Sequence, residues 1–232
     1  MSRSTEWLAQ GPSGKPPVQA ATVILVRDGA SGLETLMLRR NSKLAFGGMW
    51  VFPGGRVDPE DVAGTSTEEE AARRAAVREA REEAGLDCDL PSLVPFAHWL
   101  PPGVAPKRFS TWFFVAPAPP GAVTIDHGEI HDSAWMRPAD ALARRDAQEV
   151  ELAPPTWMTL TRLSQFETVA DLLADARRRP PTFYETRVAN STDGMIAMWD
   201  GDAGYATGDP DAPGPRHRLH IGAGAWRLEK SL

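Results

Sequence analysis

The sequence predicts an α/β protein, because strand-like segments precede and follow one long helical segment. With 232 residues, the chain has room for one domain, or one domain with an extension. Hydrophobic residues make up 42% of it and charged residues 24%, which is typical of folded soluble proteins and unlike a mainly disordered chain. The one cysteine, Cys88, excludes a disulfide framework and a zinc knuckle.

The N-terminal part predicts a tail and two paired strands. Residues 1–17 contain several glycines and prolines, so we expect a flexible tail there. Residues 20–27 and 33–40 are rich in β-branched and aliphatic side chains and flank the turn-forming residues 28–32. We therefore expect two neighbouring strands of one sheet, followed by a short strand at residues 50–52.

The strongest helix signal lies between Thr67 and Gly85. Thr67 and Glu70 have the spacing of a capping box, and Gly85 stands where a left-handed residue would end a helix at Ala84. Alanines recur at every fourth position from 72 to 84, which gives a narrow stripe of small side chains. We therefore expect this helix to lie close against the sheet.

The remaining chain predicts more strands and helices. Strands are expected at residues 93–100, 108–116, 130–136, 183–188, 195–199, 217–221 and 225–228. Helical segments are expected at residues 138–147, 157–163 and 166–178. This order indicates a tail (1–17), a core domain (18–152) and a C-terminal extension (153–232) of two helical segments and a β-rich piece, packed on the core.

The charge and hydropathy narrow the range of partners. The net charge of -6 disfavours broad binding to a nucleic-acid backbone. No apolar run is long enough to span a bilayer, and residues 1–10 contain no segment resembling a secretion signal. We therefore expect a cytoplasmic protein that binds neither nucleic acid nor membrane, and an anionic substrate would need a local site helped by a metal ion.

Three glutamates, Glu79, Glu82 and Glu83, share one face of the predicted helix. Their i, i+3, i+4 spacing brings the carboxylates together, where like charges repel. Oxygen-rich sites of this kind suit hard cations such as Mg²⁺ and Mn²⁺. Taken alone, such a cluster is more often a solvated acidic face, with Arg78 and Arg81 pairing locally.

The wider pattern resembles the Nudix box, the signature of enzymes that hydrolyse a nucleoside diphosphate linked to another group. The segment Arg78-Glu79-Ala80-Arg81-Glu82-Glu83-Ala84-Gly85-Leu86 fits its fixed positions, and Gly64 and Glu70 fit its opening literally. The resemblance implies a Nudix-type α/β/α sandwich around a mixed β-sheet. It also implies a diphosphatase that acts on a small molecule with the help of Mg²⁺ or Mn²⁺.

The opening of the box departs from the family. The family's opening glycine normally closes a Pro-Gly-Gly turn, which is Pro53-Gly54-Gly55 in this chain, and family spacing would then place the first glutamate nine residues before Glu70. We therefore interpret residues 58–66 as an insertion and Gly64 as a coincidental match. The role of Glu70 stays open, with capping of the helix as one option.

Site roles follow from the resemblance, position by position. Glu79 and Glu83 resemble the principal metal ligands. Glu82 resembles a third ligand or a catalytic group, and the carbonyl of Gly55 resembles a backbone ligand. Arg78 resembles the arginine that orients the glutamates by hydrogen bonds.

A water-activating base is expected outside this helix. Nudix enzymes often draw a further glutamate from a loop before a late strand that carries a tryptophan, and Glu129, ahead of Trp135, resembles that residue. His127 and His131 compete for the role, because imidazole suits proton transfer near neutral pH. Glu129 ranks first because a carboxylate can serve as base or as an additional ligand beside Mg²⁺.

The segment before the box resembles the coenzyme A and acyl-coenzyme A diphosphatase branch of the family. Leu36-Met37-Leu38-Arg39-Arg40 precedes Val51-Phe52-Pro53-Gly54-Gly55, although Leu44 stands where the stricter coenzyme A pattern has an arginine. Arg39 is a candidate for a substrate contact. Lys107 and Arg108 are candidates for binding an extra phosphate, such as the 3'-phosphate of coenzyme A, with a solvated strand end as the alternative. Trp50 or Trp112 is a candidate for stacking on an adenine, with packing in the core as the alternative.

Two alternatives stay open. One is another Nudix substrate, such as ADP-ribose, a dinucleotide or a non-standard nucleotide. The other is a catalytically silent Nudix module that binds a nucleotide and regulates a partner, although such modules usually lose box glutamates that this chain keeps. The oligomeric state is also open, with a homodimer as one option. The loop from Asp200 to Gly204 lacks the later glutamate of a calcium loop, so no calcium site is predicted.

Overall fold

The computed structural model describes residues 15–41, 47–105 and 108–231. They fall into two compact units. The larger unit comprises Val18–His98 and Thr111–Thr182, and the smaller unit includes Trp99–Ser110 and Phe183–Leu232. The two helical segments expected in the C-terminal extension therefore belong to the larger unit, and the division falls after Thr182 instead of after residue 152.

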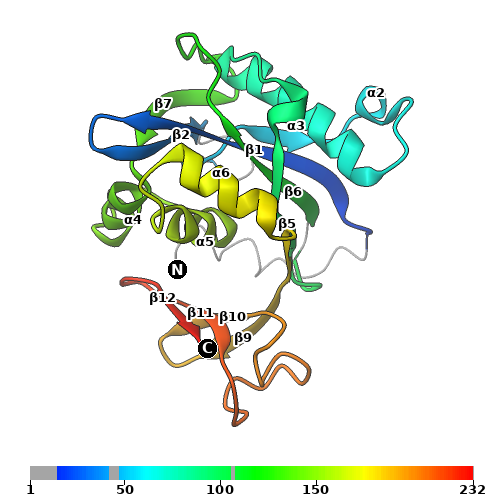
Figure 1. The fold of residues 1–232 in the computed structure, drawn as a ribbon. Coiled ribbons are helices and arrows are strands. Elements are labelled where there is room, and N and C mark those ends of the chain that lie inside the picture. Colours follow the sequence, from blue (N-terminus) through cyan, green and yellow to red (C-terminus); the bar gives the residue numbers. More distant parts are fainter. Residues whose placement is uncertain (1–14, 42–46, 106–107, 232) are drawn as a thin grey trace. The chain divides into compact units, whose positions relative to one another are not determined.

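A mixed β-sheet with the strand order β3-β2-β1-β6-β5 forms the centre of the larger unit (Figure 1). β4 pairs with β1, β7 pairs with β2, and β8 is the other neighbour of β5. The bounds are β1 Val18–Gly29, β2 Gly32–Arg40, β3 Trp50–Val51, β4 Gly54–Arg56, β5 Val94–Leu100, β6 Phe109–Pro117, β7 Ile130–Met136 and β8 Thr182–Glu185. The strands predicted before residue 140 are confirmed to within two residues at each end, and β4 is an addition.

Helix α3 (Glu68–Ala84) lies along one face of this sheet (Figure 1). The Thr67 side chain accepts a hydrogen bond from the Glu70 N–H, and Gly85 ends the helix with a φ of 67°. The Glu70 carboxylate accepts from the Ser66 N–H at 2.6 Å, so Glu70 caps the helix start. The alanine stripe of α3 is buried in one hydrophobic cluster with Leu36 and other side chains of the sheet.

Three helices, α4 (Pro138–Asp146), α5 (Pro154–Leu163) and α6 (Val169–Arg178), complete the larger unit. Figure 1 shows α5 and α6 on the side of the sheet away from α3, which confirms the α/β/α sandwich. Trp157 and other apolar side chains of α5 are buried, which explains why this helix belongs to the larger unit. No helix in the described part of the chain is both long and apolar enough to cross a bilayer.

The smaller unit contains a second, antiparallel sheet with the strand order β12-β11-β10-β9. The bounds are β9 Arg187–Ser191, β10 Gly194–Met198, β11 His217–Ile221 and β12 Arg227–Lys230. The single strand predicted at residues 183–188 is wrong, because the chain leaves β8 at Thr186 before it begins β9. The Thr186 N–H donates to the Leu100 carbonyl there, which holds the break in place.

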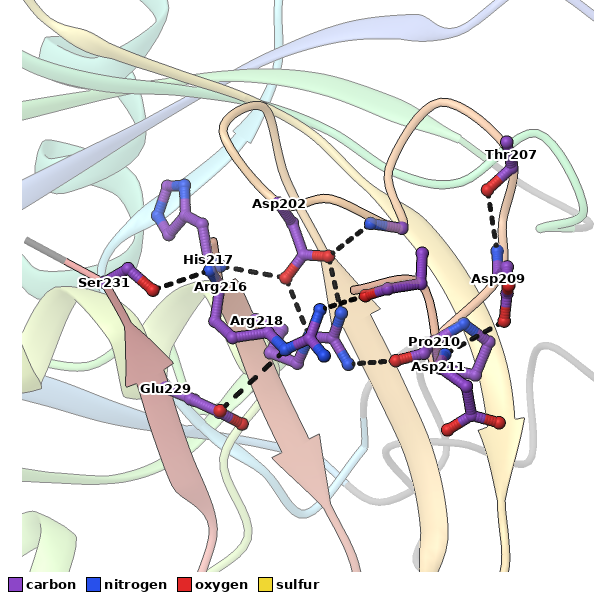
Figure 2. Close-up of polar contacts among 12 residues, drawn as sticks. Asp202, Thr207, Asp209, Pro210, Asp211, Arg216, His217, Arg218, Glu229 and Ser231 are labelled. Atoms are coloured by element: carbon purple, nitrogen blue, oxygen red, sulfur yellow. Dashed lines mark hydrogen bonds and ion pairs between the residues drawn. The ribbon is translucent and has the colours of Figure 1, made fainter. Parts of the chain in front are cut away.

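A buried ion pair holds the long loop between β10 and β11 (Figure 2). The Asp202 carboxylate accepts two hydrogen bonds from Arg218, at 2.6 and 2.7 Å, and one each from the N–H groups of Gly204 and His217. Burial alone would raise the Asp202 pKa, but these donors outweigh burial and lower the pKa to about 2. Both oxygens of Asp202 are therefore engaged within the protein.

Replacing Asp202 with Asn should lower the free energy of unfolding by roughly 3–5 kcal/mol, because the Arg218 charge would stay buried without its counter-ion. Equilibrium urea unfolding followed by tryptophan fluorescence measures the change. Asp200→Asn, an exposed position in the same loop, is the matched control and should cost less than about 0.5 kcal/mol. Similar losses for the two variants would contradict a structural role specific to Asp202.

Candidate active site

The turn at Gly54 and Gly55 lies directly against two glutamates of α3. The Gly54 N–H donates to Glu83 Oε2 at 2.9 Å. A Cβ on Gly55 would overlap the Glu79 carboxylate, so any larger residue there would displace this side chain. Pairing of β4 with β1 fixes the turn, since Gly55 lies opposite Ala21. The turn and the helix therefore meet as expected from the sequence.

Gly64, which also fits the opening of the box literally, lies elsewhere. It has a positive φ of 72° in the loop before α3, and an added Cβ there would meet no atom within 4 Å. The preceding residues form the short helix α2 (Pro59–Val62). These observations support the interpretation of an insertion between the Pro-Gly-Gly turn and α3.

Arg78 connects the acids of this region. It donates hydrogen bonds to Glu79 at 2.9 Å, to Glu82 at 3.0 Å and to Asp61 at 3.0 Å, and also to the Arg56 carbonyl at 2.9 Å. Burial alone would lower the Arg78 pKa, but Asp61 and Glu79 raise it. The side chain is therefore a fixed cation that orients the glutamates, as the resemblance implies.

Asp61 is a site residue that sequence analysis missed. It is only 5% exposed, and its Oδ2 accepts from the Asp58 N–H at 2.9 Å as well as from Arg78. The available signal was local, because Asp58 and Asp61 have capping-box spacing around Pro59. The segment interpreted as an insertion thus supplies the carboxylate that anchors Arg78.

The glutamates of α3 differ strongly in their environment. Glu83 is only 4% exposed, and this burial raises its pKa to about 8. The nearby charges of Glu79 and Glu129 add to the shift, whereas the Gly54 N–H and Arg40 oppose it. Burial also raises the Glu79 pKa, although Arg78 opposes the shift. Glu82 is mostly exposed. Burial therefore disfavours the charged forms of Glu79 and Glu83, beside the glycine turn, until a cation compensates them.

These carboxylates fit a divalent cation. Their donor atoms are all oxygens, and closely spaced buried acids are stabilised by a positive charge between them. Among the residues that the structure describes, however, no three acidic, histidine or cysteine side chains form a complete ligand set. Arg40 and Arg78 contact the acids instead. The donor set therefore suits a hard divalent cation, provided that these contacts rearrange.

The structure brings Glu129 to the same place. Its backbone is fixed just before β7, where Asn41 donates from its N–H to the Glu129 carbonyl and from Nδ2 to the Gly128 carbonyl. Asp126 accepts from the N–H groups of Glu129 and Ile130. Arg40 contacts both the Glu129 and the Glu83 carboxylates, which places Glu129 near the acids of α3. Three segments therefore meet at one acidic centre.

The competing histidines have different surroundings. Both His127 and His131 are exposed, and His127 has a positive φ of 57° in the loop. The pairing of β7 with β2 is irregular at His131, because Arg39 lies opposite Asp132 and Arg40 lies opposite Ile130. Arg40 contacts both Glu129 and Glu83, and this bridge favours Glu129 over the histidines as the group beside the acids of α3.

Arg39 and Arg40 lie on opposite faces of β2. Arg39 is exposed, whereas Arg40 donates to Glu129 at 2.7 Å and lies 3.5 Å from Glu83. The alternation of side chains along a strand was the sequence signal for Arg40. Leu36 and Leu38 face α3, and Arg40, two residues further on, points to the same face. The substrate contact expected at Arg39 is thus on the face away from the acids, and Arg40 is the arginine at the site.

The tryptophans expected to stack on an adenine are already packed. Trp50 is 6% exposed in β3 and is part of the core. The Trp112 ring stacks on His98, with the ring centroids 4.4 Å apart. Stacking of an adenine on either ring stays a prediction, and it would require a change in this packing.

The expected extra-phosphate site is not assembled by the described residues. Lys107 lies outside them. Arg108 is half-buried in the smaller unit, where its Nε donates to the Pro101 carbonyl at 3.2 Å. The extra-phosphate role of this pair stays a prediction.

Curated relatives match about half of the chain. The chicken (Gallus gallus) acyl-coenzyme A diphosphatase NUDT19 is 30% identical over 137 residues, which are 55% of this chain and 36% of that protein. The human protein of the same name is 30% identical over 135 residues, or 53% and 35% of the two chains. The chain therefore spans little more than a third of the length of these relatives.

Solved structures show the same fold. A NUDIX hydrolase from Alicyclobacillus acidocaldarius is 23% identical, with a TM-score of 0.64 over 69% of this chain and 97% of that one. The NUDIX domain of Shewanella oneidensis NrtR, solved with ADP ribose, is 20% identical, with a TM-score of 0.51 over 71% and 98%. The family model of the NUDIX domain matches residues 16–163. With more than half of its length matched by that model, and with the box glutamates facing the glycine turn, the chain belongs to the Nudix family.

Proposed function

We propose that this protein is a metal-dependent hydrolase that cleaves the diphosphate bond of coenzyme A or an acyl-coenzyme A. The observation that carries the proposal is the acidic centre, where Glu79 and Glu83 lie beside the Gly54–Gly55 turn and Arg40 joins Glu83 to Glu129. The choice of substrate is supported by the curated relatives, which are named acyl-coenzyme A diphosphatases.

Each side chain has a role in this proposal. Glu79 and Glu83 would hold Mg²⁺ or Mn²⁺ together with Glu82 and the Gly55 carbonyl, and Arg78 keeps the glutamates in position. A bound divalent ion would neutralise the diphosphate and lower the pKa of the attacking water. Glu129 accepts the proton of that water. The water oxygen bonds to one phosphorus, the bridging P–O bond breaks, and two phosphomonoesters leave.

A panel of diphosphates with Mg²⁺ tests the reaction and the substrate together. Coenzyme A should yield 3',5'-ADP and 4'-phosphopantetheine, which mass spectrometry would identify. EDTA should stop the reaction, because without a metal ion the acids of the site cannot neutralise the charge of the diphosphate. Fast turnover of ADP-ribose or a dinucleotide, with none of coenzyme A or its thioesters, would contradict the substrate and keep the reaction class.

The same panel separates an enzyme from a silent binding module. A silent module would bind nucleotides without turnover of any panel member at saturating Mg²⁺. The complete set of box glutamates, together with the convergence of Glu129 on them, favours turnover.

A further inference from the structure

Arg40, at the end of β2, bridges two acids from distant segments. Its Nη2 lies 2.7 Å from Glu129 Oε2, and its Nη1 lies 3.5 Å from Glu83 Oε1. The backbone of Arg40 is fixed independently, since its N–H donates to the Met49 carbonyl and its carbonyl accepts from the Gly48 N–H. The guanidinium can therefore change partners without any change in the strand.

Apart from its contacts with the two acids, the Arg40 guanidinium has little to fix it in place. Its Nε is buried and has no hydrogen-bond partner among the described residues. An arginine with a permanent ionic site usually satisfies more of its five donors. The two contacts with Glu83 and Glu129 are thus the main attachment of the guanidinium.

Glu83 and Glu129 are also the proposed metal ligand and the proposed base. A guanidinium that bridges them occupies the space in which a divalent cation would neutralise the same charges, and two cations so close together repel each other. We propose that Arg40 is a positioning residue that takes the place of the cation in the metal-free enzyme, keeps Glu83 and Glu129 together, and is displaced when the metal binds. This inference rests on the metal site of the proposed function.

Calorimetric titration of the metal-free full chain with Mn²⁺, without substrate, tests the displacement. Arg40→Gln should bind Mn²⁺ about tenfold more tightly than the wild type, because no guanidinium has to leave. Arg40→Lys should fall between the two, since an ammonium cannot bridge two carboxylates as a planar fork does. The matched control is Arg39→Gln, which removes the same charge from the opposite face of the same strand and should leave Mn²⁺ affinity within about twofold.

Thermal unfolding gives a second readout. The metal-free Arg40→Gln protein should have a lower Tm than the wild type, because the two acids lose their counter-ion, and Mn²⁺ should raise its Tm by more than it raises that of the wild type. A merely structural arginine would lower the Tm without tightening Mn²⁺ binding. Unchanged or weaker Mn²⁺ binding in Arg40→Gln would overturn the inference, as would equal tightening in Arg39→Gln.

A further variant separates this inference from the proposed function. If Glu83→Gln binds Mn²⁺ as the wild type does, the metal site itself is wrong. If Glu83→Gln loses Mn²⁺ binding while Arg40→Gln binds with wild-type affinity, only the role of Arg40 is overturned. Should Arg40→Gln fail to fold, the Lys variant decides the question, and wild-type affinity for it would count against the displacement.

Discussion

Glu83→Gln should lower kcat roughly 10³-fold or more while the protein stays folded. The Gln carbonyl can still accept the hydrogen bond from the Gly54 N–H, and the side chain has nearly the same volume. The variant lacks the charge that would hold a divalent cation beside Glu79. Steady-state kinetics at saturating Mg²⁺, with circular dichroism for the fold, measure both parts of the prediction.

Urea unfolding of the metal-free protein checks that the change is local. The Glu83 pKa is raised in the folded state, so this carboxyl stabilises the wild type at low pH, and that contribution is lost as pH rises towards about 8. Gln does not titrate, so the variant should gain stability relative to the wild type between about pH 4.5 and 8. Glu60→Gln, an exposed acid in α2, is the control and should keep wild-type activity. Near wild-type kcat for Glu83→Gln would show that α3 does not provide the metal site.

Glu129→Gln should lower kcat by roughly 10²-fold or more, with a smaller effect on KM. The amide keeps the size of the side chain and leaves the Asn41 and Asp126 hydrogen bonds to this loop intact, since these involve backbone atoms of the loop. It cannot accept a proton from water. Single-turnover kinetics with coenzyme A would show the loss in the chemical step.

Alanine at His127 or His131 provides the comparison for the base. Both side chains are exposed, whereas Arg40 holds Glu129 next to Glu83, so either histidine change should reduce kcat far less than Glu129→Gln does. Equal losses in a histidine variant and in Glu129→Gln would reassign the base, and normal turnover in Glu129→Gln would remove it from the mechanism.

Local features of this chain were predictable from the sequence. Helix α3 begins after Thr67 and ends at Gly85 because side-chain caps and a left-handed glycine act over three or four residues. The strands before residue 140 follow from short runs of β-branched and aliphatic residues. The placement of Glu79 and Glu83 on one face of α3 follows from the helical period alone. These features depend on neighbours in the sequence.

Long-range features were decided by the tertiary structure. Arg40 and Glu129 are separated by 89 positions, and Arg78 and Asp61 by 17. The sequence does not show which face of β2 packs against α3. It therefore predicts a site role for Arg39, whereas the structure places Arg40 at the site. Burial of Trp50 likewise became visible only with the packed core around it.

The acidic centre of this protein combines both kinds of information. The sequence by itself determined the family and the carboxylates of α3, because the box encodes a helix, its caps and its charges within one short segment. The tertiary structure decided which cations compensate those carboxylates and which loop brings Glu129 to them. The physical reason is that a buried charge is stabilised by whatever group packs within a few ångströms of it, and packing joins residues that no local pattern relates.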